Sequence, residues 1–259
     1  MTTYPLKDQL KRLHLSGVLE SLDVRLSQAR ENALSHSEWL GLILQDEIQR
    51  RDNQSLVERF KKAKFEQEKT FEGFEIARYP LKTQHLIRDM MAGHYLQEQR
   101  HILLVGPTGT GKTHLAQALG HQACRQGKKV RFIRAALFLR EMNSSRADQT
   151  WEKVLKRFVA PDLLIIDDFG LSSLTFSQAE DIYELISERT LKSSFIFTSN
   201  RKIEAWVDLF PDPAMGNAAL DRIVSKSHAI ILEGESYRRK EHSNVSSQQK
   251  EEENMTEQS

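Results

Sequence analysis

The amino-acid sequence predicts an α/β domain built on a five-stranded parallel sheet, preceded by a small all-helical module. From residue 101 onward, short apolar runs alternate with amphipathic stretches, which is typical of strands and helices around a parallel sheet. Before residue 70 the apolar residues instead recur at helical spacing, and proline is absent from Leu6 to Tyr79. A chain of 259 residues is long enough for one large domain and one small one.

The helical module is expected over residues 1–70, as three short helices. Two apolar stripes at helical spacing mark the first and the last of them: Leu15, Val18, Leu19, Leu22 and Leu26, and then Leu56, Phe60 and Ala63. Between the stripes, Ser35 and Glu38 form a capping-box pattern, which predicts the start of a helix. Residues 71–98, where glycine and proline interrupt the periodicity, are expected to be a linker and the start of the next domain.

The second domain is expected over residues 99–238. Its strands are predicted at residues 102–105, 130–133, 163–167, 195–198 and 229–232. Helical patterns fill the gaps at residues 113–126, 152–158, 177–191 and 213–225. Residues 239–259 are dominated by Ser, Gln, Glu and Lys and contain no aromatic residue, so we expect a disordered tail.

The composition excludes several classes of protein. The apolar stretches fall far short of the roughly 18 residues that a membrane-spanning helix needs, so no membrane partner is expected. The single cysteine, Cys124, cannot form an internal disulfide, so we expect a cytoplasmic protein with Cys124 as a small buried residue. Lys and Arg number 37 against 36 Asp and Glu, so any contact with a polyanion must come from local clusters of charge.

The strongest motif lies directly after the first predicted strand and directly before a predicted helix. It fits G-x-x-x-x-G-K-[ST] and consists of Gly106, Pro107, Thr108, Gly109, Thr110, Gly111, Lys112 and Thr113. Glycines let backbone N–H groups converge on phosphate oxygens, and the following helix presents its positive N-terminal end. Lys112 supplies charge for the β- and γ-phosphates, and the Thr113 hydroxyl is placed to bind Mg²⁺. The motif predicts a nucleoside triphosphate site, in which we include the next residue, His114.

Two carboxylates end the third predicted strand, where a buried parallel strand emerges at the active edge of a sheet. Asp167 is the candidate for holding Mg²⁺ through water, and Asp168 for orienting the attacking water. Neighbouring side chains on a strand point to opposite faces, so these roles require the strand to end at Asp167 and the chain to turn. Asn200, at the tip of the fourth strand, is the candidate to contact the γ-phosphate or the attacking water. A solvated acidic turn is the alternative for the two aspartates, and a simple turn residue for Asn200.

Together with the loop, residues 162–170, 198–201, 220–222 and 234–238 resemble the IstB family of AAA+ ATPases. These are helper proteins encoded beside the transposase of certain bacterial insertion sequences, and they are relatives of the DnaC-type helicase loaders. The resemblance extends from about Leu6 to Arg238, because the helical opening around residues 13–17 is also similar to that family.

The resemblance implies a bacterial AAA+ ATPase that uses ATP and Mg²⁺, forms an ATP-dependent homo-oligomer, binds duplex DNA, and assists a cognate transposase. The implied tasks are transposase activation and target DNA selection, with the helical module as the partner-binding part. In such assemblies ATP lies between subunits, and an arginine of the neighbour completes the site. On this chain that arginine is Arg222, while Arg238 resembles a second sensor that contacts the nucleotide. Many AAA+ proteins have Glu in place of Asp168, so the shorter side chain predicts slow hydrolysis.

Two clusters of basic residues are candidates for contacts with DNA. The first lies between the second and third strands and consists of Arg140, Arg146, Lys153, Lys156 and Arg157. The second lies at the end of the helical module and consists of Arg50, Arg51, Arg59, Lys61, Lys62 and Lys64. Contacts from such side chains to phosphates give affinity without sequence specificity. A solvated face is the alternative for each cluster.

Three other functions fit the same loop and acidic strand. A DnaC-type replicative helicase loader would act on a hexameric helicase and on single-stranded DNA, so a preference for duplex DNA distinguishes the two. A P-loop small-molecule kinase would need an acceptor pocket and a mobile lid, and no segment indicates either. A binding module that uses ATP only to assemble would keep its activity when Asp168 is replaced by Asn.

Overall fold

The computed structural model describes residues 4–234 and residue 236, and the chain divides into two compact units, Met1–Arg59 and Phe60–Ser259. Each unit is described by itself. The expected disordered tail at residues 239–259 and the sensor candidate Arg238 lie outside the described residues. Within the described residues, no helix is both long and apolar enough to cross a membrane.

The first unit contains the helices α1 (Tyr4–Arg12) and α2 (Ser16–Glu31) and most of α3 (His36–Ala63). The predicted capping box is confirmed, because the Ser35 hydroxyl accepts from the N–H of Glu38 at 3.3 Å and the Glu38 carboxylate accepts from the N–H of Ser35 at 2.8 Å. The prediction of three short helices was wrong in its layout. The two helices expected after Ser35 are one helix of 28 residues, and α1 was not anticipated. No glycine or proline interrupts residues 42–63, so nothing in the backbone ends the helix there.

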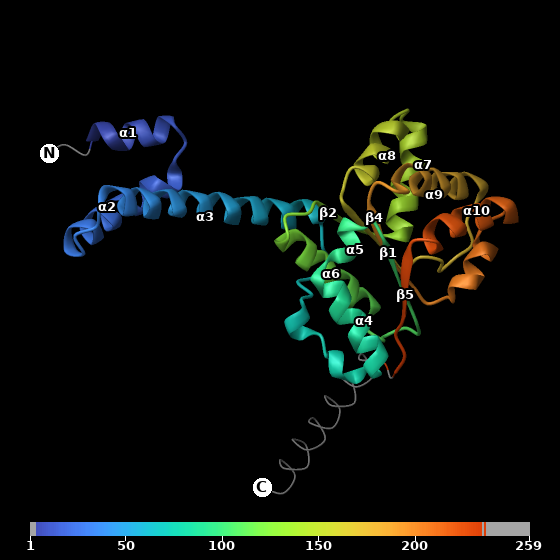
Figure 1. The fold of residues 1–259 in the computed structure, drawn as a ribbon. Coiled ribbons are helices and arrows are strands. Elements are labelled where there is room, and N and C mark those ends of the chain that lie inside the picture. The colour runs from blue at the N-terminus through green and yellow to red at the C-terminus, as the bar shows by residue number, and fades with distance from the viewer. Residues whose placement is uncertain (1–3, 235, 237–259) are drawn as a thin grey trace, which may run out of the picture. The chain divides into compact units, whose positions relative to one another are not determined.

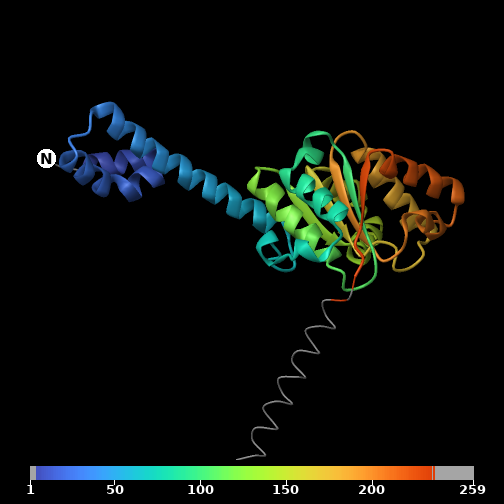
Figure 2. The ribbon, with the colours of Figure 1, turned by 60° about the horizontal axis from the view of Figure 1, so that its bottom comes forward.

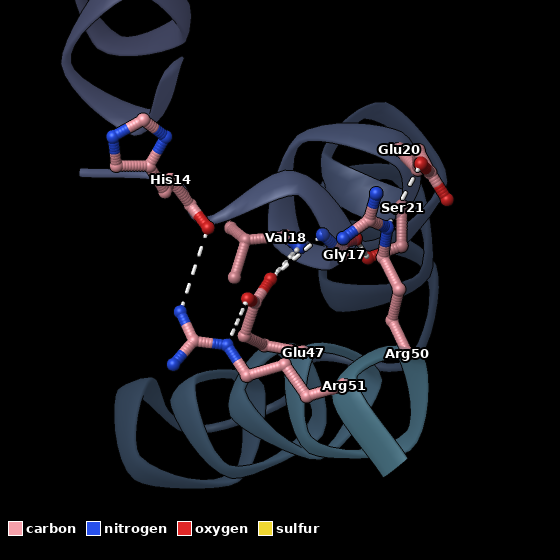
Figure 3. A network of polar contacts seen from close by, with 8 residues as sticks. All are labelled: His14, Gly17, Val18, Glu20, Ser21, Glu47, Arg50 and Arg51. Carbon is pink, nitrogen blue, oxygen red and sulfur yellow. Dashed lines mark hydrogen bonds and ion pairs between the residues drawn. The ribbon is translucent and has the colours of Figure 1, made fainter. Parts of the chain in front are cut away.

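A buried carboxylate on α3 caps the start of α2 (Figure 3). No side chain of α2's own N-terminus caps it, but Glu47 Oε2 accepts from the N–H groups of Gly17 at 2.7 Å and Val18 at 3.2 Å. Glu47 Oε1 accepts from Arg51 Nε at 2.7 Å, and Arg51 also reaches the carbonyl of His14. Burial alone would raise the pKa of Glu47, yet the bonds from Arg51 and the two N–H groups hold this pKa below its ordinary value. The charged carboxylate therefore joins the two helices.

We expect Glu47→Gln to destabilise the contact between α2 and α3 by about 1–3 kcal/mol, because it leaves buried N–H groups without a charged acceptor. Amide hydrogen exchange of the first turn of α2 in the full chain measures this directly. A lowered folded pKa means that the contribution of Glu47 is present above its ordinary pKa and is lost as the pH falls through the folded value. The unmodified chain should therefore lose this protection as the pH falls below the ordinary pKa of a glutamate, and the variant should not show this dependence.

Glu20→Gln is the matched control, since Glu20 forms an exposed pair with Arg50 at 3.1 Å. Exposed pairs contribute about 0–1 kcal/mol, so this variant should leave the exchange almost unchanged. Equal exchange in the Glu47 variant and the parent chain would show that Glu47 does not cap α2.

The second unit is built on a parallel sheet whose strands, within the described residues, follow the order β2-β3-β4-β1-β5 (Figure 1). The strands are β1 (His101–Val105), β2 (Val130–Arg134), β3 (Leu163–Asp167), β4 (Ser194–Ser199) and β5 (Ser227–Ile231). The prediction of a five-stranded parallel sheet is confirmed, with strand ends that move by no more than two residues.

Helices cover both faces of this sheet (Figure 2). One face carries α6 (Lys112–Arg125), with α4 (Leu81–Ala92) packed beside it and α5 (His94–Gln97) next along the chain. The other face carries α7 (Ala135–Ala147), α8 (Trp151–Val159), α9 (Phe176–Arg189), the 3-10 segment η3 (Ile203–Leu209) and α10 (Pro213–Val224). The alternating side chains of the strands supply both cores, and Leu103, Ile166 and Phe197 face the second group. Cys124 is fully buried on α6, as expected.

The chain after α3 packs closely against α6. It contains the 3-10 turns η1 (Phe71–Gly73) and η2 (Ile76–Arg78). Phe65 stacks on His121 with ring centroids 4.2 Å apart, and a Cβ at Gly120 would lie 2.7 Å from the Phe65 ring. Tyr79 is buried, and its hydroxyl donates to the carbonyl of Thr110 at 2.7 Å. Residues 60–79 therefore form part of the support of the glycine-rich loop.

Candidate nucleotide site

The loop of Gly106 to Thr113 joins β1 to α6, and two of its glycines are required by their surroundings. Gly106 has φ 150°, and a Cβ there would collide with the carbonyl oxygen of Leu232. Gly109 has φ 85°, and a Cβ there would collide with the hydroxyl of Ser236. L-residues with a side chain rarely adopt such backbone angles. The chain that follows β5 thus runs against the loop at both positions.

Lys112, the first residue of α6, points back over the loop and is buried. Its Nζ donates to the carbonyl oxygens of Gly106 at 2.8 Å and Pro107 at 2.7 Å. An ammonium that is bound by neutral oxygens binds a charged phosphate oxygen more strongly. The Lys112 ammonium can therefore exchange these carbonyl oxygens for the oxygens of a phosphate that enters the loop.

The carboxylate of Asp167 joins three elements at the end of β3. Its Oδ1 accepts from the hydroxyl of Thr113 on α6 at 2.9 Å and from that of Thr198 on β4 at 2.6 Å. Burial raises the pKa of Asp167, and the two hydroxyl groups act in the opposite direction. Carboxylate and hydroxyl oxygens are the ligands that Mg²⁺ prefers, so this pair fits the metal. Within the described residues no group of three or more His, Cys, Asp or Glu could hold a metal ion, so the remaining ligands would come from water and phosphate.

The strand ends at Asp167, and the chain turns directly after it. Asp168 has φ 57°, in the left-handed region, and its N–H donates to the Thr198 hydroxyl at 2.9 Å. The Asp168 side chain is partly exposed and accepts no hydrogen bond from any described residue. The two carboxylates thus have different surroundings, as the separate roles considered for them require.

The structure places a different β4 residue in this network from the one that the sequence indicated. Asn200 follows the end of β4 and is exposed, and its side chain forms no hydrogen bond within the described part of the chain. Thr198, two residues earlier, is fully buried and contacts both aspartates. A polar residue directly after the apolar run Phe195, Ile196 and Phe197 was the available signal for Thr198.

An ion pair that the sequence did not indicate lies at the same edge of the sheet. Arg134 is the last residue of β2 and pairs in register with Asp167 on β3. Its guanidinium binds the carboxylate of Glu66, from the segment that follows α3. No motif connects these two positions, which are far apart in the sequence.

Two other candidate nucleotide residues are bound elsewhere within the second unit. His114 Nε2 lies 2.8 Å from the carbonyl oxygen of Thr70, and its ring packs edge-on against Phe74. Arg222 on α10 lies 4.7 Å from the ring centroid of Tyr183 and donates to the Ser187 hydroxyl. Both partners of Arg222 belong to α9, so the structure does not join Arg222 to the network around Asp167.

The first basic cluster is only partly available for a ligand. Arg146 donates to the buried carboxylate of Asp181 at 2.7 Å and lies over the ring of Trp151. The other four members are exposed: Arg140, Lys153, Lys156 and Arg157. Lys153 and Lys156 line a cavity of about 670 Å³ beside Trp151.

In the second basic cluster, the arginines are bound by neighbouring side chains. Arg50 and Arg51 form ion pairs with Glu20 and Glu47, and Arg59 donates to the Ser55 hydroxyl. Lys61, Lys62 and Lys64 are exposed.

Comparison with known proteins gives matches along nearly the whole chain. The family model described as IstB-like ATP binding protein matches residues 8–245. An ATP-binding protein in an insertion sequence of Mycobacterium tuberculosis is 40% identical over 234 residues, which cover 90% of this chain and 93% of that protein. AMPPCP-bound DnaA from Aquifex aeolicus has a TM-score of 0.54 at 23% identity, over 64% of this chain and 50% of that one. The DnaC helicase loader has a TM-score of 0.51 at 23% identity, over 61% of this chain and 96% of that one. These two structures show a shared fold.

We expect Thr198→Val to weaken Mg²⁺-dependent nucleotide binding by about tenfold, because it removes one hydroxyl from the buried Asp167 carboxylate and the acceptor of the Asp168 N–H. Titration of a fluorescent ATP analogue at several Mg²⁺ concentrations measures this. Thr190→Val is the control, since its hydroxyl donates only to a carbonyl of its own helix, α9. Unchanged affinity in the Thr198 variant would contradict the role of this network.

Proposed function

Because the chain belongs to the IstB-like ATP-binding protein family, we propose that it hydrolyses ATP as part of an oligomer on duplex DNA and assists a transposase. The core is that of an AAA+ ATPase, and its relatives are ATP-binding proteins of insertion sequences. The observation that carries the ATPase part of the proposal is the arrangement at the start of α6, where Lys112 donates to the loop carbonyls and Thr113 donates to Asp167 at the end of β3. The proposed tasks are target DNA selection and transposase activation.

Each residue of the site has a separate role in the proposed hydrolysis of ATP. Lys112 and the N–H groups of the loop bind the β- and γ-phosphates. Thr113 and Asp167 would hold Mg²⁺, which would stabilise the charge that develops on the phosphate oxygens. Asp168 accepts a hydrogen bond from the attacking water and orients it toward the γ-phosphorus. The bond from that phosphorus to the oxygen bridging it to ADP breaks as the bond to water forms. Asn200, which follows β4 and is exposed, is the proposed contact for the γ-phosphate or the water.

Arg222 is the candidate to complete the site of a neighbouring subunit. Its ring contact and its hydroxyl partner on α9 are weak interactions for a cation, on the order of 1 kcal/mol each. A γ-phosphate presented by another copy of the chain would compete successfully with them. This arrangement makes hydrolysis depend on assembly.

The exposed members of the first basic cluster are the proposed DNA contacts. They lie on α7 and α8, between β2 and β3, and Arg146 is left out because Asp181 binds it. Contacts of this kind read the phosphate backbone, which suits a factor that must accept many target sequences. A DnaC-type helicase loader remains the alternative, and a preference for single-stranded over duplex DNA would favour it.

We expect Arg222→Ala to bind ATP with nearly normal affinity and to lose most of its turnover, because the residue acts on the neighbour's nucleotide. Lys112→Ala should bind no ATP. Mixing the two inactive variants should restore turnover, since some interfaces then combine an intact loop with an intact Arg222. Steady-state phosphate release across a series of mixing ratios measures this. Normal turnover by the Arg222 variant alone would contradict a shared site.

We also expect DNA binding to require ATP and to weaken steeply with salt, because binding to phosphates releases counterions. The double variant Lys153→Ala/Lys156→Ala should lower the slope of log K against log [salt] by about 2, or about one unit per contact. Lys82→Ala, an exposed lysine on α4 at the other face of the sheet, is the control. Fluorescence anisotropy with matched duplex and single-stranded oligonucleotides gives both the slope and the preference. A slope that the double variant leaves unchanged would place the DNA elsewhere.

A further inference from the structure

An arginine lies beside the two carboxylates of the candidate site. Arg134 and Asp167 are paired in register on neighbouring parallel strands, so their side chains leave the sheet on the same side. The bond and charge of Glu66 raise the pKa of Arg134, and the charges of Asp167 and Asp168 add to this effect. Both carboxylates therefore lie near enough to the Arg134 guanidinium to act on it electrostatically.

Arg134 is bound to Glu66 rather than to Asp168. Its Nη2 donates to Glu66 Oε2, and the two side chains are 56% and 39% exposed. Asp168 accepts no hydrogen bond within the described residues, although Thr198 holds its N–H. The Arg134 guanidinium thus has one hydrogen-bonded carboxylate, that of Glu66, and feels the charge of a second one, that of Asp168.

The ion pair between Arg134 and Glu66 is weak. Partly exposed pairs of this kind contribute little to stability, so exchange of the partner is energetically easy. A guanidinium binds a carboxylate through parallel hydrogen bonds and occupies the oxygens that would otherwise accept from water. Arg134 on Asp168 would therefore oppose the orientation of the attacking water.

The position of Glu66 is set by its neighbours in the chain. Phe65 stacks on His121 of α6, and the N–H of Gln67 donates to the side chain of Gln117, also on α6, at 3.3 Å. Ala63, the last residue of α3, is fully buried. Glu66 is thus held between two residues that are anchored on the helix that begins with Lys112.

We propose that Glu66 is a positioning residue of the ATPase, which keeps Arg134 away from Asp168 and so leaves Asp168 able to orient water. This inference rests on the proposed hydrolysis of ATP. Loss of the Glu66–Arg134 pair lets the guanidinium move to Asp168 and slows turnover without weakening the binding of the nucleotide. Displacement of the segment after α3, which carries Glu66, has the same effect.

Four variants of the full chain test the proposal: Glu66→Gln, Arg134→Met, the double variant of both, and Glu68→Gln as the control. Glu68 is exposed, lies two residues from Glu66 and forms no ion pair within the described residues. We expect Glu66→Gln to lower kcat by about tenfold, because a guanidinium that occupies the Asp168 oxygens leaves fewer of them to accept from the attacking water. The affinity for a fluorescent ATP analogue and the thermal midpoint should stay close to those of the parent chain.

The double variant gives the decisive comparison. With Arg134 removed, the loss of Glu66 should no longer matter, so the double variant and Arg134→Met should share a kcat at or above that of the parent chain. A normal kcat for Glu66→Gln, or an equal loss with and without Arg134, would overturn the inference while leaving the proposed ATPase intact. No turnover by the parent chain with DNA present would remove the proposed function itself, and this inference with it.

Discussion

One buried carboxylate oxygen connects the parts of the nucleotide site. Asp167 Oδ1 accepts a hydrogen bond from Thr113 on the helix that follows the loop and another from Thr198 on the adjacent strand. Asp167 is only 1% exposed, and burying a carboxylate is costly unless its oxygens accept hydrogen bonds. The hydroxyls of Thr113 and Thr198 supply these bonds and so allow Asp167 to be buried. Through this oxygen, α6, β3 and β4 are fixed to one another at the edge where phosphate would bind.

Two cations of the proposed ATPase are held by partners that a phosphate can replace. The ammonium of Lys112 is bound by loop carbonyls, and Arg222 by an aromatic ring and a hydroxyl. Each of these interactions is weaker than a charge-assisted bond to phosphate. Both cations can therefore move to phosphate in the proposed ATPase cycle, whereas the inferred role of Glu66 requires Arg134 to stay where it is.

The sequence was sufficient for those features that depend on local pattern. Apolar runs of strand length located all the strands of the sheet, and the loop motif located Lys112 and Thr113 between β1 and α6. The sequence was insufficient to predict contacts between residues that are distant in the sequence. Thr198 and Asn200 are both polar residues near the end of β4, and only the pairing of β4 with β3 brings Thr198 to Asp167. Likewise, Arg146 looked like a DNA contact because Asp181, its partner, is distant in the sequence. The length of α3 was missed because its apolar stripes were taken as separate helices.

Burial of the thiol on α6 has a practical consequence. Cys124 is the single cysteine of the chain and is fully buried, so reagents that alkylate exposed thiols will react with it slowly. A cysteine introduced at a surface position can then be labelled selectively without first removing the native one.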